Sequence, residues 1–205
     1  MADTPHWPVN HELTEIMRNC VQLFGSSTDR STPESLRDYA LLSVALATVR
    51  RVSEIAGLRY QHLHRDGNTC VVDFDHCKGK KSFTNRLEAK TTRVLYTYLE
   101  AVYPGQLLQL PGDAPVWVSF SDRNRGQAIG TRTLSNICET YLGTSKTHAP
   151  RHTLAVRMHR MNAKLTAIQK ALGHSNPAIT GVYLEEHLSY ENPLAAELEE
   201  EFGIE

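Results

Sequence analysis

The sequence predicts an α+β protein that is mostly α-helical and carries a small antiparallel β-sheet. In most segments apolar residues recur three and four positions apart, which is the spacing of one face of a helix. Residues 68–87 instead combine strand-forming residues with a central turn, which indicates a β-hairpin. At 205 residues the chain is long enough for one well-buried domain and too short for two of ordinary size.

The first third of the chain is expected to be helical. Residues 1–30 contain a short helix with an apolar stripe. A second helix starts with Ser31 as its cap, because Pro33 falls in the first turn and Glu34 lies three residues after the serine. This helix becomes apolar all round toward its end, so we place it in the core. A short helix should follow, with Ser53 as its cap and Glu54 as its first residue.

The middle of the chain alternates regular elements with polar loops. The expected hairpin turns at the lysine-rich residues 78–81. Residues 89–102 read as a helix with one apolar side, and residues 116–120 as a short apolar strand or core segment. Residues 121–130 form a polar loop, and a further helix is expected to start at Thr131 or Thr133 and to close near Gly143.

A candidate anion site lies at the start of the next expected helix. Pro150 suits the first position of a helix, because its fixed φ fits there and its missing N–H would have no partner. Arg151 then falls in the first turn, where free backbone N–H groups and the helix dipole favour an anion. Since a guanidinium grips oxyanions in a two-pronged fork, His148 and Arg151 together suggest a phosphate site.

The segment that follows brings another histidine and a tyrosine into reach of each other. A helix with apolar Leu165 to Leu172 is expected to stop at Gly173, and Asn176 caps a restart. On one straight helix, nine positions at about 100° per residue would put His174 and Tyr183 on opposite faces. The break lets Tyr183 turn back toward His174.

Charge is distributed unevenly along the chain. The net charge is −1, but eight of the 23 acidic residues and none of the 22 basic ones lie from Glu185 onward. Residues 1–184 therefore carry a net charge of +7 and residues 185–205 form an acidic tail. A basic body is what binding to a phosphate backbone needs, and the tail could cover that surface or dock on a neighbouring copy.

The composition indicates a globular protein with no membrane partner. No apolar run approaches the ~18 residues of a membrane span, and the first residues lack the plan of a signal peptide, so we expect the chain in the cytosol. The four cysteines show no C-x-x-C spacing and suggest neither a disulfide framework nor a zinc knuckle; they are Cys20, Cys70, Cys77 and Cys138.

Three motifs resemble those of the tyrosine recombinase (phage integrase) family. That family has H-x-x-R, then L-G-H, then a tyrosine nine residues after that histidine, and here these are HAPR from His148, LGH ending at His174, and Tyr183. The stretch TVRRVSEI resembles the family's T-G-L-R-I-S-E-L, with Arg51 as its arginine and with valine and arginine replacing the usual Gly-Leu. Lys78 matches the lysine of a G-K-G-x-K type hairpin, with Cys77 replacing the preceding glycine.

The resemblance implies the tyrosine recombinase catalytic-domain fold and a metal-free, ATP-free phosphoryl-transfer site on double-stranded DNA. Two arginines would stabilise the nonbridging oxygens, and a tyrosine with a phenol pKa of ~10 would attack with help from a histidine. The implied roles are phosphate stabilisation for Arg51 and Arg151, nucleophile for Tyr183, help with its proton for His148, protonation of the leaving 5′-oxygen for Lys78, and a phosphate hydrogen bond for His174. The product would be a 3′-phosphotyrosyl link, with no cofactor.

Each residue taken singly also has an ordinary interpretation. Tyr183 could be a core aromatic, His174 a helix cap, and Arg151 the partner of a glutamate. Three lysines in one turn are usually solvated. A zinc site at His148 and His152 is disfavoured, because no third ligand lies at metal-ligand spacing. Against these, six positions occur in family order over about two thirds of the chain.

The family resemblance also sets the expected organisation and function. We expect a single catalytic domain over residues 1–205, divided into an N-terminal helix or linker (1–30), a catalytic core (31–184) and an acidic tail helix (185–205). We expect the family's N-terminal DNA-clamp domain to be absent from this chain, which would make it a fragment of a longer integrase, or else a minimal stand-alone version.

The expected function is that of a site-specific DNA recombinase or integrase of a mobile element, cytoplasmic and nucleoid-associated if the source is prokaryotic. Two alternatives are a type IB topoisomerase, which shares the chemistry, and a catalytically inactive DNA-binding relative. The family implies self-association as a tetramer on DNA through the acidic tail. The same tail could instead cover the DNA surface of its own subunit.

Overall fold

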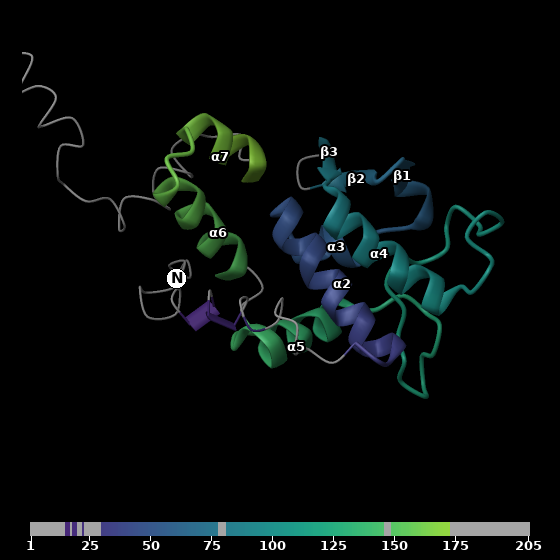
Figure 1. Cartoon of the computed structure of the whole chain (residues 1–205). Coiled ribbons are helices and arrows are strands. Elements are labelled where there is room, and N and C mark those ends of the chain that lie inside the picture. Colours follow the sequence, from purple (N-terminus) through teal and green to yellow (C-terminus); the bar gives the residue numbers. More distant parts are fainter. Residues whose placement is uncertain are drawn as a thin grey trace, which may run out of the picture.

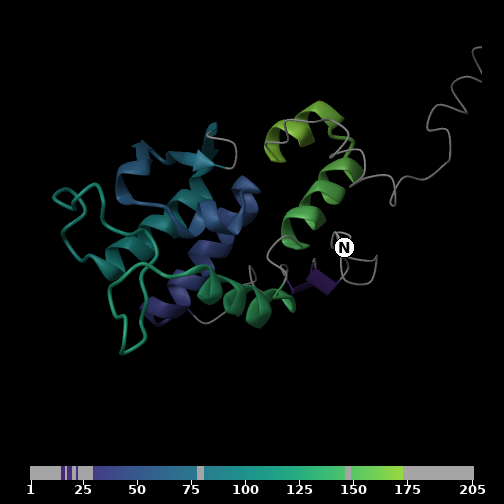
Figure 2. The same cartoon turned by 180° about the vertical axis from the view of Figure 1, so that it is seen from behind.

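Helix α2 (Pro33–Thr48) lies at the centre of the molecule, with the sheet and helix α4 on one side and helices α6 and α7 on the other (Figure 1). The view from behind shows the same arrangement, with α5 along one edge (Figure 2). This computed structural model describes residues 15, 16, 18, 19, 22, 30–77, 81–145 and 149–172. Within these residues the predicted fold class, mostly α-helical with a small antiparallel sheet, is confirmed.

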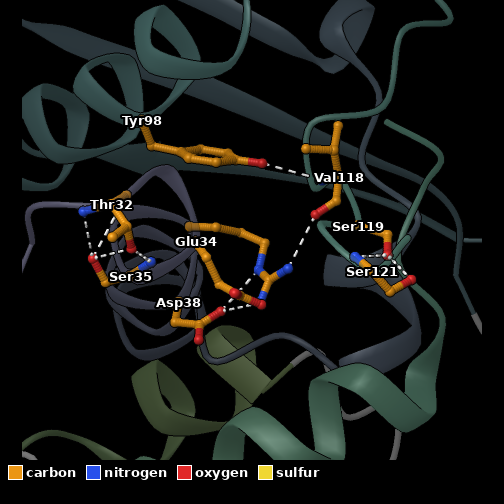
Figure 3. Close-up of polar contacts among 9 residues, drawn as sticks. Thr32, Glu34, Ser35, Asp38, Tyr98, Val118, Ser119 and Ser121 are labelled. Atoms are coloured by element: carbon orange, nitrogen blue, oxygen red, sulfur yellow. Dashed lines mark hydrogen bonds and ion pairs between the residues drawn. The ribbon is translucent and has the colours of Figure 1, made fainter. Parts of the chain in front are cut away.

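The predicted start of α2 is correct to within one residue, but its cap is not Ser31. The cap is Thr32, whose hydroxyl accepts a hydrogen bond from the backbone N–H of Ser35 at 3.1 Å. The Ser35 hydroxyl accepts in return from the Thr32 N–H at 3.2 Å, which completes a capping box. Ser35 therefore takes the place that the sequence pattern gave to Glu34. Both residues appear in Figure 3.

Helix α2 ends in a corner that leads into the short helix α3 (Val52–Ala56). Val49 is the C-cap residue in the left-handed conformation, with φ 54° and ψ 27°, and its N–H donates to the Ala45 carbonyl at 2.9 Å. The expectation that Ser53 caps this helix and Glu54 begins it is wrong by two residues, because the helix begins at Val52. The predicted inward-facing residues are confirmed, since Ile55 and Leu58 are both buried.

The sheet has three antiparallel strands in the order β1 (Leu63–Asp66), β2 (Thr69–Cys77) and β3 (Lys81–Leu87). The predicted hairpin is confirmed as β2 and β3, which pair Phe74 with Phe83 and become irregular between Phe74 and Cys77. Alternate residues of β2 face the core, where Cys70, Val72 and Phe74 are buried. Strand β1 was not predicted.

The main core lies between α2, α4 (Ala89–Val102) and the segment 116–118. Helix α4 matches its predicted bounds, and the segment is a buried core stretch joined to its neighbours by isolated bridges rather than a regular strand. Trp117 is fully buried, donates its indole N–H to the Ile55 carbonyl at 2.8 Å and stacks on Tyr98 with ring centroids 5.6 Å apart. Trp117 thus ties the core to α3.

A charged network around the buried Arg37 holds α2 to the same segment (Figure 3). Arg37 donates to Asp38 at 2.8 Å, to Glu34 at 3.2 Å and to the Val118 carbonyl at 3.2 Å. The Val118 N–H donates to the Tyr98 hydroxyl at 3.1 Å. Burial raises the pKa of the Asp38 carboxyl above its ordinary value, although the Arg37 guanidinium beside it opposes that rise.

Three further helices complete the described chain: α5 (Thr131–Leu142), α6 (Ala149–Arg160) and α7 (Leu165–Leu172). Gly143 ends α5 in the left-handed conformation, as its predicted stop requires. Pro150 is the second residue of α6 rather than the first. A turn with Asn162 at φ 60° separates α6 from α7. The two helices pack together through a second apolar cluster.

Among the described residues, none of the helices is both long enough and apolar enough to span a membrane. Several expectations lie outside the described residues: most of the helix in residues 1–30, the hairpin turn at 78–80, the restart after Gly173 and the acidic tail.

Candidate active site

Two of the six predicted site residues lie in the described part of the chain, Arg51 and Arg151. The other four, Lys78, His148, His174 and Tyr183, lie outside it. Three of these four are nevertheless close in sequence to a described element. Lys78 follows β2 directly, His148 precedes α6 directly, and His174 comes two residues after the end of α7.

Arg51 stands between α2 and α3 and is held by the first turn of α3. Its backbone N–H donates to one carboxylate oxygen of Glu54 at 2.9 Å, and its Nη1 donates to the other at 3.1 Å. The Glu54 side chain is 5% exposed, whereas that of Arg51 is 26% exposed. A nearly buried carboxylate therefore orients a guanidinium that a ligand can still reach.

Arg151, in the first turn of α6, is buried to 4% exposure. Its Nη1 donates to the Val49 carbonyl at 2.9 Å and its Nη2 to the Leu172 carbonyl. One side chain thus joins α6 to the corner after α2 and to the last residue of α7. The carbonyls at a helix C-terminus carry partial negative charge and have no partners inside the helix, so a guanidinium is a favourable cap there.

The hydrogen bond from Arg151 to the carbonyl of Val49 joins two residues that are 102 positions apart in sequence, and so brings the two arginine motifs together. Val49 is two residues before Arg51. The same valine packs in the apolar cluster of α6 and α7 with Ala155, Ile168 and Leu172. The corner is therefore fixed from both sides, by a hydrogen bond to its backbone and by apolar contacts to its side chain.

Arg50 was not assigned a role from the sequence, yet it is 6% exposed and lies in the same junction. Its Nη2 donates to the Ala171 carbonyl at 2.8 Å. Its guanidinium carbon lies 4.2 Å from the centroid of the Phe83 ring. The sequence offers one signal for this residue, because arginine stands here where the family pattern has leucine.

Exposed basic side chains lie at the end of α6, in the turn before α7 and in the last turn of α7. They are Arg157, Arg160, Lys164 and Lys170. Positive charge on exposed side chains of neighbouring helices is suited to a phosphate backbone. This distribution agrees with the basic body that the sequence predicts.

One groove of the described residues lies elsewhere. It has a volume of about 560 Å³ between β1 and α4 and is lined in part by Arg65, Arg93 and Tyr96. Neither Arg51 nor Arg151 lines it. A polynucleotide is bound on a surface rather than inside a small cavity, so we place the candidate site by its side chains and not by this groove.

Comparison with known proteins gives a consistent picture. Residues 10–189 match the phage integrase family. The chain is 30% identical over 203 residues to tyrosine recombinase XerD of Lacticaseibacillus casei, covering 94% of this chain and 64% of that protein. The chain therefore spans less than two thirds of the length of this curated relative.

Two solved structures show the fold. The XerH site-specific recombinase bound to difH substrate, a pre-cleavage complex, matches with a TM-score of 0.64 at 18% identity, over 95% of this chain and 53% of that one. The catalytic domain of bacteriophage HP1 integrase matches with a TM-score of 0.50 at 17% identity, over 96% of this chain and 94% of that one.

Proposed function

Because the chain belongs to the phage integrase family and has the fold of its tyrosine recombinase catalytic domains, we propose that it is the catalytic part of a site-specific DNA recombinase. It cuts and rejoins double-stranded DNA of a mobile element through a 3′-phosphotyrosyl intermediate. The observation that carries this proposal is the contact between Arg151 and the corner at Val49, which joins the two predicted phosphate-binding motifs.

The two arginines have different supporting geometry. Arg51 is partly exposed and oriented by Glu54, which suits direct contact with the nonbridging oxygens of the scissile phosphate. Arg151 holds the corner and the end of α7, and supplies positive charge from the protein interior. Fixed positive charge stabilises a five-coordinate phosphorus without reorganisation during the reaction.

The remaining roles follow the family motifs. Tyr183 attacks the phosphorus, His148 assists the loss of its phenol proton, His174 hydrogen-bonds a phosphate oxygen, and Lys78 gives a proton to the departing 5′-oxygen. The phosphotyrosyl bond conserves the energy of the phosphodiester, so religation needs no ATP. Because arginines and lysine supply the positive charge, the reaction needs no metal ion.

Self-association on DNA extends this proposal. The chain acts as a tetramer on paired DNA sites, with the tail of residues 185–205 docked on a neighbouring protomer. The support is the tail's eight acidic residues against a body of net charge +7, which makes attraction between copies favourable. Deleting residues 188–205 is expected to reduce cooperative assembly on DNA and to lower cleavage. Tighter binding and higher cleavage at low salt would instead indicate autoinhibition.

The proposal is tested with a pool of nicked duplexes whose central segment is randomised. Cleavage next to a nick releases a short strand and traps the protein–DNA adduct, which denaturing electrophoresis separates and sequencing then identifies. Wild type should form adducts, Tyr183→Phe should form none while binding DNA normally, and the matched control Tyr190→Phe should react like wild type. Adducts that persist in Tyr183→Phe would refute the assignment.

A second experiment separates the leaving-group acid from the phosphate-binding arginine. Replacing the 5′-bridging oxygen with sulfur gives a leaving group that needs no proton, so Lys78→Ala should regain cleavage on that substrate. Arg51→Ala should not regain it, because Arg51 acts on nonbridging oxygens. Relaxation of supercoiled plasmid without strand exchange between two sites would favour the topoisomerase alternative.

A further inference from the structure

We propose that Arg50 is a positioning residue, which fixes the end of α7 against the β2–β3 hairpin and so aligns the catalytic groups that follow these elements in sequence. The inference rests on the proposed function and deepens it. Arg50 links two elements that the family motifs do not connect. Ala171, at one end of the link, is three residues before His174, and Phe74, near the other end, is four residues before Lys78.

The hairpin side of the link is aromatic. The guanidinium carbon of Arg50 lies 4.2 Å from the Phe83 ring centroid and 6.0 Å from that of Phe74. These two residues face each other across β2 and β3 at the last regular pair before the hairpin becomes irregular. A cation over an aromatic face gains more when water is excluded, as it is here at 6% exposure of Arg50. Arg50 therefore contacts the hairpin close to its turn.

The helix side of the link is polar. Nη2 of Arg50 donates to the Ala171 carbonyl at 2.8 Å, and Arg151 donates to the carbonyl of the next residue, Leu172. These carbonyls belong to the last turn of α7, where intrahelical donors are missing. The two arginines thus cap the same helix end from two directions, and the direction in which the chain leaves α7 depends on both.

Leucine, which the family pattern has at this position, would keep only half of this link. It could pack against Phe74 and Phe83, but it has no donor for the Ala171 carbonyl. Lysine would keep the charge, but it lacks the planar guanidinium, which can stack on an aromatic ring and at the same time donate a hydrogen bond from its edge to a carbonyl. Arginine is therefore the residue that joins the aromatic hairpin to the helix end.

Arg50 is too buried to act as a second phosphate ligand in place of its neighbour Arg51. The whole of Arg50 is 6% exposed, whereas the side chain of Arg51 is 26% exposed. Substitution of Arg50 should therefore change the rate of the chemical step and leave DNA affinity nearly unchanged. A residue that contacts the DNA backbone would show the opposite result, with weaker binding and a smaller salt dependence.

The experiment measures single-turnover cleavage at saturating protein, together with the DNA dissociation constant and the melting temperature. The substrate is a nicked duplex of a sequence that wild type cleaves from the randomised pool. Arg50→Leu should cleave 10- to 100-fold more slowly, since a shift of about 1 Å in a catalytic group can cost about 100-fold. The DNA dissociation constant of Arg50→Leu should stay within about twofold of wild type. The cleavage rate of Arg50→Lys should lie between those of wild type and Arg50→Leu.

Two further variants keep the test decisive if Arg50→Leu folds poorly. Phe83→Leu removes the ring and leaves Arg50 in place, so it should also slow cleavage at unchanged affinity. Because the two residues act through one contact, the double variant should be no slower than Arg50→Leu alone. The matched control is Arg65→Leu, which removes an arginine of strand β1 stacked 4.6 Å from the ring centroid of Tyr96 in helix α4, and should cleave like wild type.

The outcomes separate the inference from the proposed function. A wild-type protein that forms no adduct would refute the proposed function and this inference with it. Wild-type adducts with unchanged cleavage by Arg50→Leu and Phe83→Leu would refute the inference alone. So would weaker DNA binding with a normal saturated rate, an equal slowing by Arg65→Leu, or rate losses in the double variant that multiply.

Discussion

The corner at Val49 gives a prediction about stability. In a helix, alanine is normally a more stable replacement than glycine, and at this position we expect the opposite order. Val49 adopts φ 54° and ψ 27°, the left-handed conformation that a β-branched residue rarely tolerates. In this conformation the Cβ of an L-residue crowds the following carbonyl, at a cost of roughly 1–2 kcal/mol, and glycine avoids that cost. The family pattern has glycine at this position, and the left-handed corner supplies the physical reason.

The comparison to make is Val49→Gly against Val49→Ala. Both variants lose the isopropyl group of Val49, a residue that is 7% exposed and packs on α6 and α7. Removing two buried methyl groups costs about 2 kcal/mol. Val49→Ala keeps most of the crowding at Cβ, whereas Val49→Gly is relieved of it at an entropic cost of roughly 0.5–1 kcal/mol. We therefore expect Val49→Gly to be more stable than Val49→Ala by about 0.5–1 kcal/mol.

The assay is urea unfolding followed by tryptophan fluorescence, for which buried Trp117 is a native probe. Val44 is the matched control, because it is a buried valine in the interior of the same helix α2. There the order should be the ordinary one, with Val44→Ala more stable than Val44→Gly by about 1 kcal/mol. If alanine were also the more stable replacement at position 49, the corner would not be left-handed and the argument would fail.

Three other predictions test the network and the site. Arg37→Met should lower the free energy of unfolding by about 3–5 kcal/mol, because it leaves Asp38 buried without its partner. Adding Asp38→Leu should restore part of this loss. Urea unfolding that shows a loss below about 1 kcal/mol for Arg37→Met would contradict the prediction. Thermal melting of Arg151→Ala should show a destabilisation of about 2 kcal/mol or more, because two buried carbonyls lose a donor, whereas Arg51→Ala should abolish adduct formation. Wild-type cleavage should proceed in excess EDTA without nucleotide, and a magnesium requirement would indicate a nuclease-like mechanism.

The elements that the sequence predicts well are those whose pattern is complete within one segment. Helix α4 has its predicted bounds, Ala89–Val102, because one apolar face and a polar face are present throughout its length. The β2–β3 hairpin has strand formers on both sides of a turn. In each case the residues that decide the structure are neighbours along the chain.

Strand β1 shows what such patterns cannot give. Its four residues include one buried side chain, Leu63, and three exposed ones. They form a strand because they pair with residues Thr69 to Val72 of β2, and that pairing is a property of the sheet rather than of the four residues. The cap of α2 was misplaced for a related reason, since Ser31 and Thr32 are both good caps and the hydroxyl of Ser35 decides between them.

For the candidate site, the order and spacing of the motifs predicted which residues to consider, but not how the arginines are used. Sequence reasoning assigned Arg151 to phosphate, and the structure adds its bonds to the carbonyls of Val49 and Leu172. It gave no role to Arg50, which binds the carbonyl of Ala171. Main-chain carbonyls are identical at every position, so a sequence cannot indicate which of them a buried side chain will meet.

The consequence concerns how the site is assembled. The end of α7 has carbonyls that its own helix cannot satisfy, and two arginines from distant segments supply the missing donors. One of these arginines also holds the carbonyl of Val49, a residue kept in a strained conformation. A strained corner persists where its surroundings determine it from several sides, and here a hydrogen bond, an apolar cluster and the cap of a helix do so together. Relief of the strain at Val49 should therefore leave the junction in place, whereas loss of either arginine should loosen the end of α7.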